Sequence, residues 1–398
     1  MTGTMSAADA AVLFDGARLT MARHLAGLRK SELAQVVEKS PTAVTGWELG
    51  TKRPSAATVA QLALRLGVDP SFFTVAANDV VIPSSAPHFR SLRSTTQLAR
   101  DQALSYGQLA FGIAANLERS VEFPKVDIPE HAVDAEDLDA DGPEQAAQHL
   151  RSEWGLGDRP VPHLVRLLEN HGVLVLFSPP QAASVDAYSF DSARRPVVVL
   201  NPLKRDYYRQ RFDLAHELGH LVMHAEADPG DRIVEEQANR FASELLMPED
   251  LIAPLLPSVM NASAWASLAR LKEQWGVSMQ ALLFRARRLG VLGDVSYRNA
   301  MTTISARGWR RNEPGQVTAL EHPSLLPRAV ELLGSEGVDE QTLAAECRAP
   351  LGLFCAATSR APLPGNTSAE YGTHANIVRS IVSLLNLESS EAKGGEGT

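Results

Sequence analysis

The chain has 398 residues, 44% of them apolar, and a formal net charge of −9. This length predicts two to four domains. The charge excludes a uniformly basic nucleic-acid binder but not one small basic module. The only two cysteines, Cys347 and Cys355, exclude a disulfide framework and a four-cysteine metal site. Because the N-terminus lacks a signal-peptide pattern and no apolar run approaches the roughly 20 residues of a membrane span, we expect a cytoplasmic protein without membrane contact.

Residues 14–75 are expected to form a compact helical unit. Ser40 and Pro41 supply an N-cap and a first helical residue, and Gly50 and Gly67 stand where two helices would end. Residues 1–75 hold eight Lys/Arg and six Asp/Glu, a balance of +2, so the remainder carries −11. This charge asymmetry fits a small DNA-binding domain attached to an acidic remainder of the chain.

The stretch KSELAQVVEKSPTAVTGWELGTKRPS (residues 30–55) contains two short helices joined by a tight turn, with residues 41–49 as the predicted recognition helix. We expect Thr42, Ala43 and Thr45 near base edges of double-stranded operator DNA. Phosphate contacts are expected from Lys30, Lys39, Lys52 and Arg53. The stretch resembles the XRE (Cro/cI-like) helix-turn-helix family. A purely structural three-helix unit or a protein-docking module is the alternative.

Residues 76–142 are expected to be a helical connector followed by an acidic linker. Apolar side chains recur at alternating steps of four and three over residues 98–121, which predicts one amphipathic helix. This stripe packs either inside its own subunit or along the seam of a homodimer. Between residues 134 and 144 there are six acidic residues and no basic ones, which indicates a solvated linker.

A second unit, with helices and a small β-sheet, is expected at residues 143–255. Helices are predicted at 144–155 and 162–172, and strands at 172–177, 184–190 and 195–201. The last of these strands is expected to present an edge to an extended substrate.

The stretch AHELGHLVMH (residues 215–224) follows these strands and contains the HExxH pattern. His216 and His220 are four residues apart, so on a helix both rings point the same way, and neutral imidazoles in this arrangement bind one Zn²⁺. Glu217 lies about 100° round the helix and suits a general base that is not itself a ligand. His224 lies about 80° round the helix from His216, so it does not share the face of the two candidate ligands. We expect it to pack or to form hydrogen bonds instead.

A zinc site of this kind needs a third protein ligand and an open fourth position. Residues 232–248 predict a second helix, with Glu235 and Glu236 near its start and Pro248 at its end. We prefer Glu235, because Asn239 then lies one turn further on the same face and can hydrogen-bond a zinc-bound histidine. Glu236 is the alternative ligand.

The sequences RFDLAHELGHLVMH and EEQANRFASELLMP together resemble the ImmA/IrrE family of zinc metallopeptidases over residues 143–290. The resemblance implies a compact zincin-like fold, zinc held by His216, His220 and Glu235, and Glu217 as the base. It also implies cleavage of a helix-turn-helix repressor, which relieves repression after stress. The family often has Glu where this chain has Gln237.

Residues 256–292 are expected to form a helical extension, and residues 293–398 a helical C-terminal region that ends in a disordered tail. The basic stretches 87–94 and 307–315 either pack as linkers or add phosphate contacts. Near the motif in sequence, Tyr207, Tyr208 and Arg211 are candidates for an additional oxyanion donor, and none can be assigned.

The sequence therefore predicts a multidomain, mainly helical protein with an α+β part. The first functional hypothesis is a transcription regulator that is also a zinc endopeptidase acting on a repressor-type protein, itself or a partner. The second is a transcription factor whose peptidase-like domain senses a metal or ligand without cleaving, and the third is a non-enzymatic interaction protein. The complete HExxH motif with a third Glu favours the first, because a pure sensor need not keep Glu217.

Overall fold

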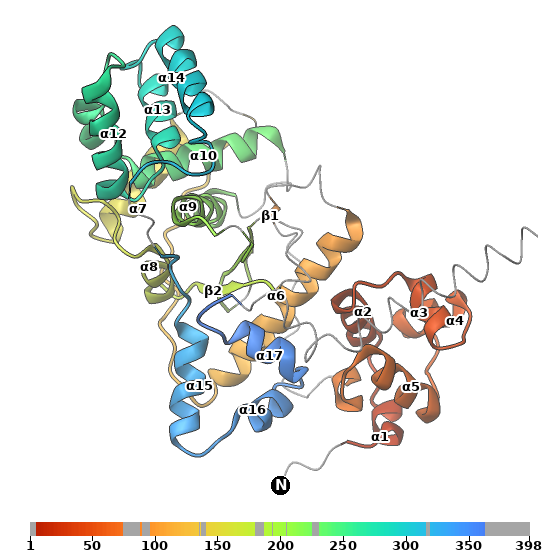
Figure 1. The fold of residues 1–398 in the computed structure, drawn as a ribbon. Coiled ribbons are helices and arrows are strands. Elements are labelled where there is room, and N and C mark those ends of the chain that lie inside the picture. The colour runs from red at the N-terminus through yellow and green to blue at the C-terminus, as the bar shows by residue number, and fades with distance from the viewer. Residues whose placement is uncertain are drawn as a thin grey trace, which may run out of the picture.

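The computed structural model describes residues 5–74, 88–89, 96–134, 136, 141–179, 187–192, 194–203, 205–224, 231–315 and 319–362. The predicted disordered tail, most of the basic stretch 87–94 and five of the eleven residues of the acidic linker lie outside these ranges. The described chain is mainly helical and contains one small mixed sheet, which confirms the predicted fold class (Figure 1). No helix in these ranges is long and apolar enough to cross a membrane.

The N-terminal bundle contains the predicted helix-turn-helix unit. Ser40 caps the fourth helix by accepting a hydrogen bond from the Ala43 N–H, and Gly67 ends the fifth in the left-handed conformation, at φ 66°. The first helix of the bundle was not predicted from the sequence. It packs against the fifth helix and extends the bundle to residues that precede the predicted start at residue 14. The elements are α1 (Ala7–Val12), α2 (Gly16–Leu25), α3 (Lys30–Val36), α4 (Pro41–Glu48), α5 (Ala56–Leu66) and the 3-10 helix η1 (Pro70–Phe73).

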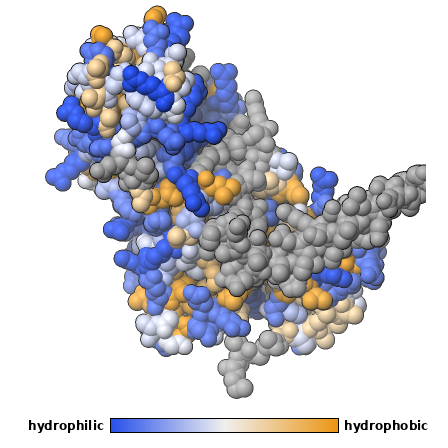
Figure 2. Space-filling model, viewed as in Figure 1, coloured by the Kyte–Doolittle hydropathy of each residue, from blue (hydrophilic) through white to orange (hydrophobic). Residues whose placement is uncertain are grey.

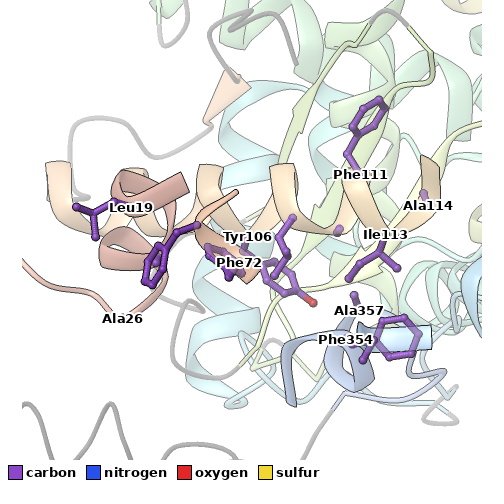
Figure 3. Close-up of a cluster of buried hydrophobic side chains, with 14 of the residues drawn as sticks. Leu19, Ala26, Phe72, Tyr106, Phe111, Ile113, Ala114, Phe354 and Ala357 are labelled. Carbon is purple, nitrogen blue, oxygen red and sulfur yellow. The ribbon is translucent and has the colours of Figure 1, made fainter. Parts of the chain in front are cut away.

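The amphipathic helix predicted at 98–121 is α6 (Gln97–Leu117), which links the bundle to the rest of the molecule. Its apolar stripe is buried within the chain, against α2 and against α15 (Leu325–Ser335) and α17 (Leu351–Ala357). Figure 3 shows this continuous cluster along α6, with Phe72 of the bundle and Phe354 of α17 both close to the helix. These contacts favour packing within one subunit over a dimer seam.

The sheet has the strand order β1-β3-β4-β2. Its strands are β1 (His88–Phe89), β2 (Leu174–Phe177), β3 (Tyr188–Phe190) and β4 (Val197–Leu200). The prediction that residues 195–201 form an exposed edge is wrong, because β4 lies between β2, to which it is parallel, and β3, to which it is antiparallel. The backbone N–H and C=O groups of β4 form hydrogen bonds with a strand on each side. β1 pairs with β3 at the other end of the sheet.

The two faces of the sheet contribute to two different apolar cores, because alternate residues of a strand point to opposite faces. Leu174 and Leu176 pack with α6, α15 and α17, whereas Val175 and Phe177 pack with helices on the other face. The latter helices are α7 (Gly142–Glu153), α8 (Leu164–Asn170), α9 (Tyr207–Met223) and α10 (Arg232–Leu246). The C-terminal helices α15, α16 (Glu340–Glu346) and α17 therefore help α6 to cover the sheet.

The helical extension follows α10. It begins with α11 (Glu249–Ile252) and the 3-10 helix η3 (Ala253–Leu255), and continues with α12 (Ala262–Trp275), α13 (Met279–Arg288) and α14 (Asp294–Ala306). α14 packs against α13, and its buried Ala300 and Ile304 belong to the same core as α9 and α10. This packed unit therefore continues beyond the boundary at residue 292 that the sequence predicts.

Candidate metal centre and DNA-binding surface

The HExxH segment lies on α9, which packs closely against α10. Asp206 caps α9 by accepting hydrogen bonds from the Tyr208 and Arg209 N–H groups. At Gly219, inside the motif, a Cβ atom would lie 2.9 Å from the ring of Phe241 on α10. Glycine at this position therefore permits the close approach that brings side chains of the two helices together.

His216, His220 and Glu235 place one ligand atom each within 4.8 Å of one another. The two Nε2 atoms are 3.1 Å apart, and the Glu235 carboxylate oxygens lie 3.3 Å from His216 Nε2 and 3.8 Å from His220 Nε2. A tetrahedral zinc ion with bonds of about 2 Å separates its ligand atoms by about 3.3 Å. The three side chains therefore fit one Zn²⁺ ion.

The carboxylate of Glu235 also has the chemistry that a cation site requires. Its Oε1 is buried and accepts no hydrogen bond from the described residues, and a buried oxygen of this kind is destabilising unless a cation or donor satisfies it. Glu236, the alternative ligand, instead pairs with Arg288 at 3.1 Å. Of the two candidates, the structure brings Glu235 to the histidines.

Asn239 lies where the sequence places it, one turn beyond Glu235 and beside His216. Its Oδ1 is 3.1 Å from His216 Nδ1. Because a carbonyl oxygen can only accept, His216 Nδ1 carries the proton and His216 Nε2 keeps its lone pair. That lone pair points toward the cluster, as metal binding requires.

A chain of three hydrogen bonds orients His220 in the same way. Gln237 Nε2 donates to the Asp134 carbonyl at 2.7 Å, which turns Gln237 Oε1 toward His224 Nε2 at 2.9 Å. His224 therefore donates through Nε2 and accepts through Nδ1, which lies 3.1 Å from His220 Nδ1. His220 then carries its proton on Nδ1 and keeps the Nε2 lone pair for the metal. The sequence assigns hydrogen bonding to His224 but gives no role to Gln237 or Asp134.

Glu217 is fully buried and lies outside the three-ligand cluster. Its Oε2 accepts a hydrogen bond from Ser189 Oγ on β3 at 2.7 Å, and Ser189 is also the residue that pairs with His88 of β1. Sequence reasoning missed Ser189. The available signal was a single hydroxyl between Tyr188 and Phe190, in a strand whose three residues are all buried.

The predicted DNA-binding residues lie on and around α4. Thr42 is exposed, and Ala43 and Thr45 are half-buried. The side chains of Lys39 and Lys52 are exposed and have no ion-pair partner within the described part of the chain. Lys30 and Arg53 are already engaged, Lys30 with Glu48 at 3.2 Å and Arg53 with the carbonyl of Val12 at 2.5 Å. Lys39 and Lys52 are therefore the two predicted phosphate contacts that remain available.

Comparison with known families agrees with both parts of this description. Residues 168–287 match the family model described as the IrrE N-terminal-like domain, a peptidase family, and residues 19–73 match a helix-turn-helix model. The chain joins a helix-turn-helix domain to an IrrE-like domain. Both resemblances seen in the sequence are thereby confirmed, in the same order along the chain. A comparison with curated proteins gives no match.

Of the three candidate oxyanion donors in the IrrE-like domain, Arg211 has a structural role. Its guanidinium is buried, and it donates to Glu321 Oε1 at 2.6 Å and to the carbonyls of Val161 and Pro162. The ring of Tyr207 lies under this guanidinium, and burial raises the pKa of the Tyr207 hydroxyl. Arg211 therefore holds the start of α9 in place and is not available to a substrate.

Proposed function

We propose that this chain is a DNA-binding transcription regulator whose IrrE-like domain is a zinc endopeptidase. Its substrate is a repressor-type protein, either the chain itself or a partner. The observation that carries the proposal is the convergence of His216 Nε2, His220 Nε2 and a Glu235 oxygen within 4.8 Å, with Glu217 on the same helix. A helix that acted only through its surface would have no reason to bury His216, Glu217 and His220 together and to bring them beside Glu235.

In this proposal His216, His220 and Glu235 bind the metal, while Asn239 and His224 hold the two histidine rings with their lone pairs toward it. Bound Zn²⁺ supplies a Lewis acid, which lowers the pKa of a water ligand and polarises the scissile carbonyl. Glu217 accepts a proton from the attacking water and delivers it to the leaving amine nitrogen. Ser189, which donates to Glu217 Oε2, holds the carboxylate in place for both transfers.

A peptide can add to a sheet as a further strand, but β3 lies between β4 and β1, so an extended substrate could pair with β3 only in place of β1. β1 already pairs with β3 antiparallel, next to the serine that contacts Glu217. β1 belongs to the connector between the two domains, which supports including the chain itself among the candidate substrates.

The helix-turn-helix domain is proposed to bind operator DNA with α4 in the major groove. Thr42, Ala43 and Thr45 face base edges, and Lys39 and Lys52 contact phosphates. Proteolysis and DNA binding in one chain would allow cleavage to change transcription directly.

The test is a comparison of new protein N-termini in host cells that express either the natural chain or Glu217→Gln. We expect fragments of a repressor-type protein, or of the chain itself, with the natural chain only. Removal of a general base lowers the rate by about 10²–10⁴-fold, which would eliminate the fragments. Identical fragment patterns together with zinc-dependent DNA affinity would instead identify a metal sensor that does not cleave.

A further inference from the structure

A cleft of about 1320 Å³ lies between α9 and α10 on one side and α12, α13 and the turn at residues 310–313 on the other. Small-molecule pockets usually measure roughly 300–1,000 Å³, so this cleft has room for a larger ligand. Its lining includes Asn239, which contacts His216, and Glu236, which follows Glu235 in the chain. The cleft therefore adjoins the candidate metal centre.

Positive charge dominates the lining, in which eight residues are Arg or Lys and four are Asp or Glu. All four carboxylates are already used within the protein. Asp206 caps α9, and the other three form ion pairs. These pairs are Glu144 with Arg240 at 2.5 Å, Glu236 with Arg288 at 3.1 Å, and Glu313 with Lys272 at 3.4 Å.

Three arginines of the lining have no carboxylate partner in the part of the chain that the structure describes: Arg205, Arg310 and Arg311. All three are exposed. Among the described residues, Arg310 donates to Ser305 Oγ alone, and the guanidinium groups of Arg205 and Arg311 form no hydrogen bond. Because no described acidic side chain pairs with them, they give the cleft a positive potential that attracts anionic groups. Figure 2 shows the many hydrophilic residues on the surrounding lobe of α12, α13 and α14.

The cleft also offers apolar contacts. Leu203 is 62% exposed and Phe284 is 41% exposed, and both line it. By contrast, Lys272 Nζ lies 4.6 Å from the centroid of the Tyr208 ring, and Tyr207 packs edge-on against the same tyrosine. A face of Tyr208 is thus already covered by a cation, which disfavours base stacking of a single-stranded nucleic acid. Arginines without a described carboxylate partner, in the same cleft as exposed aliphatic and aromatic side chains, fit a polypeptide better.

We infer that this cleft binds the protein substrate through a segment in which acidic side chains alternate with apolar ones. The inference rests on the proposed function only in naming the occupant as the substrate; the binding preference follows from the cleft itself. Arg205, Arg310 and Arg311 bind the acidic side chains, and Leu203 and Phe284 contact the apolar ones. The segment then lies beside the metal centre, where an adjoining peptide bond can be hydrolysed.

The test measures fluorescence anisotropy of a short labelled peptide of alternating Glu and Leu, titrated with the full-length, zinc-loaded Glu217→Gln protein. Adding Arg205→Gln, Arg310→Gln and Arg311→Gln is expected to weaken binding about tenfold, equivalent to about 1.4 kcal/mol. Salt should weaken binding to the unmodified cleft more than to the triple variant. A matched control changes Arg119, Arg159 and Arg328 to Gln, three exposed arginines outside the cleft, and should leave the affinity unchanged.

The cleft assignment is overturned if a Lys-Leu peptide binds as well as the Glu-Leu peptide, or if the two triple variants behave alike. It is also overturned if a short single-stranded oligonucleotide binds more tightly than the peptide and loses affinity with the same three arginines. Binding as predicted, without fragments in the host, would leave the cleft assignment standing and overturn the endopeptidase. Fragments in the host, together with peptide binding that does not depend on charge, would support the endopeptidase and overturn the cleft assignment.

Discussion

At the scale of single residues, the candidate metal centre depends on which ring nitrogens carry protons. Neither histidine can bind a metal through Nε2 unless its Nδ1 holds the proton, and both Nδ1 atoms lie at 3.1 Å from a group that can accept it. For His216 this group is the Asn239 oxygen. For His220 it is His224, which is itself oriented by Gln237.

Replacing Gln237 with Leu should weaken zinc binding about 10–100-fold, the usual effect of losing a hydrogen-bond partner behind a metal ligand. Without the Gln237 oxygen, His224 can place its proton on Nδ1, and it then no longer accepts from His220. The measurement is a competition titration with a chelator of known affinity. Gln145→Leu, at an exposed position on α7, is the matched control, and equal affinities for the two variants would show that the chain of hydrogen bonds does not act on the metal.

At the scale of elements, α9 is held by a buried ion pair between Arg211 and Glu321, whose side chains are 1% and 4% exposed. Glu321 also accepts a hydrogen bond from the Val165 N–H at the start of α8. Its backbone exchanges two hydrogen bonds with the side chain of Gln210. One carboxylate therefore ties the segment before α15 to two helices of the IrrE-like domain.

We expect Glu321→Ala to lower the free energy of unfolding by about 3–5 kcal/mol, because it leaves the Arg211 charge buried without its partner. Urea titration followed by circular dichroism measures this change. The control is Asp294→Ala, which removes the partner of Arg287 in an exposed pair and should cost less than about 1 kcal/mol. Similar values for the two variants would contradict the assigned role of Glu321.

α4 has the exposed surface expected of a recognition helix, and the lysines around it make separable predictions. Lys39→Ala and Lys52→Ala should each weaken binding to any duplex and reduce the slope of log K against log salt by about 0.9. Thr42→Ala should change the preferred sequence more than the overall affinity. Lys125→Ala, an exposed lysine after α6, should alter neither quantity, and an equal effect at Lys125 would exclude α4 as the DNA-binding element.

Much of this local structure could be predicted from the sequence, because its signals are local. Ser40 and Gly67 mark helix ends, and the four-residue spacing of His216 and His220 fixes their shared helix face. The order of the sheet could not be predicted, because β3 pairs with β1 across about 100 residues of sequence. The sequence of a short strand does not identify the strand with which it pairs. The hydrogen bond from Ser189 to Glu217 depends on that tertiary arrangement and was missed for the same reason.

At the scale of the whole molecule, the helix-turn-helix domain shares its apolar core with α6 and with one face of the sheet. His24 lies at this junction, with Nδ1 3.3 Å from Ser105 Oγ and Nε2 3.7 Å from Asp101. Burial lowers the pKa of His24, and the charge of Arg23 lowers it further, against smaller opposing effects of Asp101 and Glu48. His24 therefore loses its proton more readily in the folded protein than a free histidine side chain does.

Because the folded pKa of His24 lies below its unfolded value of 6.5, the unfolded chain binds this proton more readily. The stability that His24 contributes is present above pH 6.5 and is lost as the pH falls from there through the folded pKa. We expect the thermal midpoint to fall less between about pH 7.5 and 5.5 in His24→Gln than in the natural chain. Parallel pH profiles for the two proteins would show that His24 does not sense protons at this junction.

The zinc content of the purified chain tests the metal centre most directly. We predict about one zinc per chain for the natural protein and for Glu236→Ala, and almost none for His216→Ala, His220→Ala or Glu235→Ala. Circular dichroism should show that all five proteins keep their helices. A natural chain that purifies without zinc and does not bind it on addition, or a Glu235→Ala variant that retains it, would contradict the metal centre described here.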